Sequence, residues 1–97
     1  MLAWLTTEEA CDLLRTSGDN ATIVEALAAG LPAYVETTTG YPAKSVGLKS
    51  CHELVRALCR FLLQLWYDPD GTDAAQLTKV VDGLTYAVKA MVVAEGL

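Results

Sequence analysis

The stretch LKSCHELVRALCRFLLQLWY, residues 48–67, decides the fold class of this chain. Its apolar side chains recur every three to four residues, which is the period of one face of an α-helix. A second apolar row, which includes Leu54 and Phe61, flanks the first and makes the apolar arc wide. A helix of this kind is normally covered by several neighbours. We therefore predict that residues 48–67 form the central helix of the fold, and its longest.

A capping box precedes another predicted helix near the start of the chain. Thr6 stands three residues before Glu9, the spacing at which each side chain bonds the other residue's backbone N–H. We expect this helix over residues 7–16. Gly18 should end it, because glycine readily takes the left-handed conformation found after helices.

The next predicted helix runs from Asn20 to the three threonines before Gly40. Its apolar residues recur at helical steps, at Ile23, Leu27, Leu31, and Tyr34 or Val35. Pro32 lies inside it and removes a backbone hydrogen bond, so we expect a kink or short break near Gly30. Gly40 and the following Pro42 should end the helix, with threonine hydroxyls bonded to its last carbonyls.

The last predicted helix follows the turn DPDGTD, residues 68–73. Asp73 and Gln76 have the spacing of a helix start, and we expect the helix to reach about Ala94. Gly83 in its interior should allow close approach to another helix. Its apolar stripe comprises Leu77, Val81, Leu84, Val88, and Met91 or Val92. With no hairpin signal elsewhere, the predicted fold class is all-α, a bundle of four helices.

The composition indicates one small domain, residues 1–97, that associates with other proteins. A fraction of 53% apolar residues is more than a small monomer needs to cover its core, so partner subunits are expected to cover part of it. The net charge is -5, and the seven basic residues are scattered along the sequence. Nucleic-acid binding relies on many lysine and arginine contacts to phosphates, so the charge argues against it.

No targeting or membrane signal is recognised in the sequence. The N-terminal segment lacks a basic region, and Arg56, Arg60 and Gln64 interrupt the longest apolar run, so we expect a cytoplasmic protein without a membrane span. Cys51 and Cys59 would lie about 12 Å apart along one helix, too far to form a disulfide. We expect the three cysteines to be buried, reduced thiols.

The sequence carries no enzyme, metal or cofactor signature. His52, the single histidine, is adjacent to Cys51, and neighbours on a helix point about 100° apart, so the two would not form a nucleophile and base pair. A calcium loop around Gly71 fails in register, because Trp66 and Leu77 would occupy ligand positions. We predict that the protein is not an enzyme and needs no cofactor.

Together, the order of these features resembles the phage head–tail connector family, also called head completion or adaptor proteins. The resemblance covers nearly the whole chain, although each of its motifs is a helix cap, a core stripe or a helix end. It rests on LTTEEA at 5–10, LLR at 13–15, GD at 18–19, AYVE at 33–36 before TG at 39–40, WY at 66–67 after the long apolar helix, and the last helix through 80–89.

The resemblance implies a structural subunit that forms a homo-oligomeric ring at the head–tail junction of the virion. Such a ring contacts the portal protein and a tail or second connector protein, and DNA passes through it without sequence-specific binding. Candidate contact residues are Trp4, Tyr41, Lys44, Trp66 and Tyr67. Trp4 could instead anchor the N-terminal segment to the bundle, and Trp66 and Tyr67 could fill the core. The alternative function is a small acidic regulator or adaptor, such as an anti-repressor or antitoxin-like protein.

Overall fold

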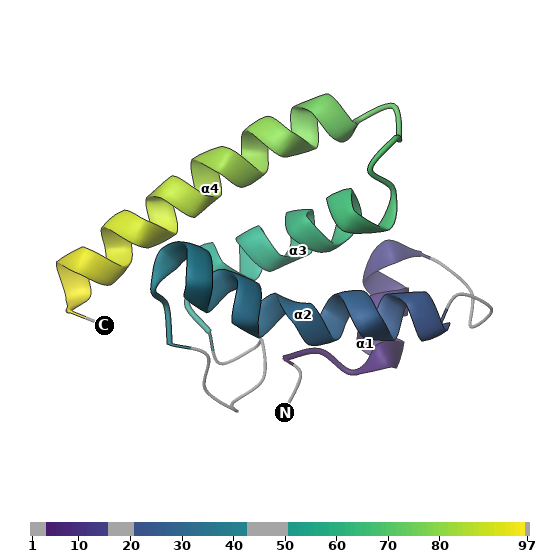
Figure 1. The fold of residues 1–97 in the computed structure, drawn as a ribbon, viewed down its shortest axis with the longest axis horizontal. Coiled ribbons are helices and arrows are strands. Elements are labelled where there is room, and N and C mark those ends of the chain that lie inside the picture. Colours follow the sequence, from purple (N-terminus) through teal and green to yellow (C-terminus); the bar gives the residue numbers. More distant parts are fainter. Residues whose placement is uncertain (1–3, 16–20, 43–50, 97) are drawn as a thin grey trace.

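Four α-helices make up the described part of the chain. The computed structural model describes residues 4–15, 21–42 and 51–96. The helices are α1 (Thr7–Leu14), α2 (Ala21–Thr39), α3 (Glu53–Tyr67) and α4 (Ala74–Glu95). Helix α3 lies between α4 on one side and the α1–α2 pair on the other, and it contacts each of the other three (Figure 1). The predicted all-α class is confirmed.

Helix α3 is shorter than its sequence pattern predicts. It begins at Glu53, not at residue 48, because His52 is its N-cap: the His52 Nδ1 accepts a hydrogen bond from the Leu54 N–H at 3.1 Å. The helix therefore has 15 residues, whereas α4 has 22. The prediction that α3 is the longest helix is wrong, since apolar periodicity alone does not locate a cap.

Helix α1 starts where predicted and ends early. The capping box is present, with the Thr6 N–H donating to Glu9 Oε1 at 2.9 Å and the Glu9 N–H donating to Thr6 Oγ1 at 3.1 Å. The helix stops at Leu14, because Arg15 takes the left-handed conformation with φ of 55° and donates its N–H to carbonyls of the last turn. Gly18, the predicted terminator, lies outside the described residues.

Helix α2 is one continuous helix through Pro32, so of the two predicted alternatives, a kink or a short break, the break is absent (Figure 1). Its buried face is Val24, Ala28, Leu31 and Val35, whereas Ile23 is 57% exposed and Tyr34 is 37% exposed. The predicted stripe was therefore partly in the wrong register. Residues packed into the core on both sides of the proline hold the helix together, which offsets the missing hydrogen bond.

The end of α2 matches the prediction. The Thr39 hydroxyl, which is buried, donates to the Val35 carbonyl at 2.6 Å, and the Thr38 hydroxyl donates to the Tyr34 carbonyl at 2.7 Å. Gly40 has φ of +82°, the left-handed conformation that ends many helices. Its N–H still donates to the Glu36 carbonyl at 2.9 Å.

Helix α4 packs one face on α3 and exposes the other. Among the described residues, nothing lies within 4 Å of a Cβ atom added at Gly83, so none of the four helices makes the predicted close approach there. The buried residues contributed by the two helices are Val55, Leu58, Cys59, Leu62 and Leu63 of α3 and Val81, Val88, Met91 and Val92 of α4. Among the described residues no helix is long and apolar enough to cross a membrane.

Candidate interaction surfaces

Two of the predicted contact residues, Trp4 and Tyr41, pack on each other at the N-terminal side of the bundle. Trp4 is only 3% exposed, and its ring meets the Tyr41 ring edge-on, with centroids 6.4 Å apart. Trp4 therefore anchors the N-terminal segment to the bundle, which is one of the two alternatives raised by the sequence. Tyr41 is half-buried. Lys44 lies outside the described residues.

Trp66 and Tyr67 are both half-buried at the C-terminal end of α3. The Trp66 ring packs edge-on against Tyr34 of α2, with centroids 5.0 Å apart. That contact is worth about 0.5 to 1.5 kcal/mol beyond the area it buries, so Trp66 mainly joins two helices. Tyr67 lines a surface groove.

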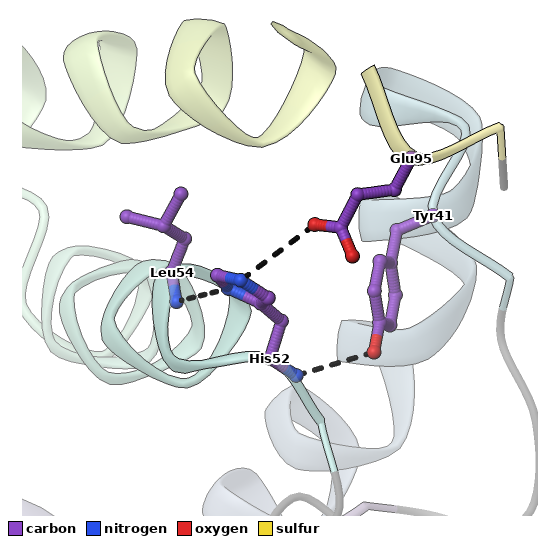
Figure 2. Close-up of polar contacts among 4 residues, drawn as sticks. All are labelled: Tyr41, His52, Leu54 and Glu95. Carbon is purple, nitrogen blue, oxygen red and sulfur yellow. Dashed lines mark hydrogen bonds and ion pairs between the residues drawn. The ribbon is translucent and has the colours of Figure 1, made fainter. Parts of the chain in front are cut away.

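A hydrogen bond and an ion pair connect the ends of three helices (Figure 2). The Tyr41 hydroxyl, just after α2, accepts a hydrogen bond from the His52 N–H at 3.2 Å. On the other side His52 Nε2 lies 3.8 Å from Glu95 Oε2, near the end of α4. The His52 and Glu95 side chains are 40% and 52% exposed, so this ion pair adds little stability. His52 thus caps α3 and connects its start to the ends of α2 and α4.

The three cysteines are free and buried, and two have perturbed acidity. Burial raises the pKa of Cys51, against the lowering effects of a hydrogen bond with Tyr41 and the charge of Arg56. Burial also raises the pKa of Cys59 to about 12, with a smaller contribution from Cys51. Both thiols remain protonated at neutral pH and are poor nucleophiles. In the described ranges no group of side chains could hold a metal ion.

A groove of about 580 Å³ lies where α1 ends, α2 begins, and α3 turns into α4. We call it the end groove. Its apolar lining includes Leu14, Ile23, Tyr67 and Leu77, and its acidic lining is Asp68 and Asp73. No basic residue of the described part lines it. The end groove is thus an apolar hollow with a negatively charged rim.

The three arginines of the chain, Arg15 after α1 and Arg56 and Arg60 on α3, line two neighbouring shallow hollows, and we call them the arginine row. Arg15 and Arg60 line one hollow together with Asp12, and Arg60 and Arg56 line the next one together with Glu53, beside Phe61. The first hollow shares Leu14 with the end groove. In the sequence these basic residues are scattered, but the fold brings them into one row.

The third surface is the outer face of α4, defined by Asp82, Tyr86, Lys89, Ala90 and Val93, all of which are exposed. Tyr86 is 76% exposed and Val93 is 82% exposed, and the two lie seven residues apart on the same side of the helix. Because two large apolar side chains share this uncovered face, it is a candidate surface for contact with another protein.

Sequence reasoning did not identify Ile23, Tyr86 and Val93 as exposed apolar residues. A signal for Tyr86 exists, because it lies two residues from Val88 and therefore on the opposite side of α4 from the buried stripe. Ile23 gave none, since Ile23 and Val24 fit the helical period equally well until the neighbouring helices are known.

Comparison with models of known protein families gives no match, and comparisons with curated proteins and with solved structures give none either. The resemblance to head–tail connectors rests on the sequence features alone.

Proposed function

We propose that this chain is a structural subunit of the head–tail connector type, which assembles into a ring at the portal vertex and joins the DNA-filled head to the tail. The observation that carries the proposal is the outer face of α4. Tyr86 and Val93 are 76% and 82% exposed there, and a neighbouring subunit would remove them from water. Burying apolar surface gains about 25 cal/mol per Å², which favours association.

The charge of the chain supports a role beside DNA without sequence recognition. The net charge of -5 repels a phosphate backbone on average, so DNA would pass without adhering. The arginine row offers at most about three cationic contacts, far fewer than a DNA-binding surface uses. It is better matched to carboxylates of a partner protein, such as the portal or a second connector.

A small acidic regulator or adaptor, of the anti-repressor or antitoxin kind, is the alternative. An exposed apolar helix face on an acidic helical domain also suits capture of one partner protein. The two functions differ in partner. Flanking genes for portal, capsid and tail proteins would favour the connector, whereas a neighbouring repressor or toxin gene would favour the regulator.

Binding to purified portal protein from the same phage or prophage tests the proposal. The chain is expected to co-sediment with the assembled portal in a fixed stoichiometry, and electron microscopy should show added density at one end of the portal. A candidate repressor or toxin serves as the competing bait. Binding to that protein with none to the portal would contradict the connector function.

A further inference from the structure

We propose that neighbouring copies of this chain join head to tail, with the outer face of α4 of one copy seated in the end groove of the next. This inference rests on the proposed function, because it names the two surfaces that would connect subunits of the ring.

The positions of the two surfaces carry the first step. The end groove lies at the start of α4, and Val93 lies near its end, about 24 Å farther along at 1.5 Å per residue from Leu77. The longest dimension of the molecule is 41 Å, and α4 runs along most of it (Figure 1). Two different contact surfaces, one at the start of α4 and one along its second half, give a head-to-tail contact, which closes into a ring or extends as a filament.

Apolar side chains match across the proposed contact. Tyr86 and Val93 project from the outer face of α4 about two turns apart. In the end groove Ile23 is 57% exposed, and half-buried Leu14 and Leu77 lie beside it. In the proposed contact, the exposed apolar side chains of each surface would therefore be buried by those of the other.

Charges also match, and they fix the direction of the incoming helix. Lys89 lies between Tyr86 and Val93, and the groove rim carries Asp68 and Asp73. Asp82, one turn before Tyr86, would then point toward the hollow beside Leu14, where Arg15 and Arg60 outnumber the single carboxylate of Asp12. With Lys89 against the aspartates of the groove rim and Asp82 against the arginines, the incoming helix can bind in only one orientation.

A symmetric pair of α4 helices is the competing arrangement. Antiparallel packing would also set Asp82 against Lys89 of the partner copy. It would, however, place Val93 beside Thr78 and Lys79, which are polar, and leave the end groove uncovered. The head-to-tail contact covers both apolar surfaces, so the structure favours it.

The test uses variants that block one surface each. Tyr86→Asp with Val93→Asp gives a chain with a blocked face, and Ile23→Arg gives a chain with a blocked groove. All three side chains are more than half exposed, so the fold should be retained, as circular dichroism will verify. Thr37→Asp, on the exposed side of α2, is the matched control.

Sedimentation velocity up to about 1 mM measures the assembly of each chain. The wild type and the control should form species larger than dimers as concentration rises, and each blocked variant should remain monomeric. An equal mixture of the two blocked variants should form dimers and nothing larger, because one intact face meets one intact groove. A mixture that stays monomeric, a blocked variant that assembles like the wild type, or a monomeric wild type would overturn the inference.

Charge reversal provides a second readout that does not depend on the blocking variants. Lys89→Glu should weaken self-association about tenfold, and Asp73→Lys should restore much of it when both are in the same chain. No restoration would contradict the assigned pairing of the two surfaces.

The result is separable from that of the proposed function. If the wild type binds the portal and both blocked variants still form rings, the head-to-tail contact is wrong and the connector function stands. If the mixture forms dimers while the chain does not bind the portal, the contact is right and the connector function is wrong.

Discussion

Replacing glycine by alanine at two helix positions should change the stability of this protein in opposite directions. Gly83 lies inside α4, and an added Cβ atom would meet nothing within 4 Å. Gly40 follows α2 with φ of +82°, and an added Cβ atom would lie 3.6 Å from Val92 Cγ1. At Gly83 the added Cβ atom thus lies in open space, whereas at Gly40 it is attached to a backbone in the left-handed conformation.

The magnitudes follow from these two environments. Gly83→Ala should raise the free energy of unfolding by about 0.5 to 1 kcal/mol, because alanine loses less backbone freedom in a helix. Gly40→Ala should lower it by about 1 to 2 kcal/mol, the cost of a left-handed conformation for a residue with a Cβ. The contact with Val92 at 3.6 Å is ordinary van der Waals packing, so backbone strain sets the cost.

Urea denaturation followed by far-ultraviolet circular dichroism measures both changes. The two variants should differ by roughly 1.5 to 3 kcal/mol, which for a domain of this size separates their melting temperatures by roughly 6 to 24 °C. Low protein concentration keeps self-association out of the comparison. A neutral Gly40→Ala would refute the left-handed end of α2, and a destabilising Gly83→Ala would mean that another part of the protein covers this side of α4.

Four further predictions probe the core and its acidity. Leu58→Ala should lower the free energy of unfolding by about 2 to 5 kcal/mol, because Leu58 is fully buried. Tyr86→Ala, at an exposed position, should change it by under about 0.5 kcal/mol. Similar effects for both variants would refute the central position of α3. Leu58→Asp, which adds a charge to the core, should prevent folding, as circular dichroism would show. Thr39→Val should cost about 1 to 3 kcal/mol in urea denaturation, because the buried hydroxyl also accepts a bond from the Tyr41 N–H at 3.2 Å; an unchanged midpoint would contradict this role. Burial raises the pKa of Cys59 from 9.0 to about 12, so as the pH rises the unfolded chain loses this proton before the folded one does. Cys59 should therefore not affect the free energy of unfolding below about pH 8, and should lower it by up to about 1.4 kcal/mol per pH unit above about pH 9. In Cys59→Ala this decrease with pH should be shallower.

Features that depend on near neighbours in the chain could be predicted from the sequence. The Thr6 and Glu9 capping box forms as expected, and Gly40 ends α2 with threonine hydroxyls bonded to the last carbonyls. The stripe of α4 was also found, because Val81 and Val88 belong to a single clear register. In each case the signal and its partner lie within one or two helical turns.

Features that depend on contacts between helices could not be predicted in the same way. The sequence allowed Ile23 or Val24 to face the core, and only the packing of α2 against the other helices decides for Val24. Pro32 predicted a kink or a short break, because the cost of the missing backbone hydrogen bond can be recognised in the sequence. The packing of α2 against the other helices, which offsets that cost, cannot. Arg15 lies more than 40 residues from Arg60, so their common row emerges only from the fold.

The proposed connector function implies a phage or prophage source, and deleting the gene from it and imaging the particles tests the central claim most directly. The account predicts DNA-filled heads without attached tails, no infectious particles, and recovery of both when the wild-type gene is supplied. Normal numbers of infectious particles with tails attached would contradict it.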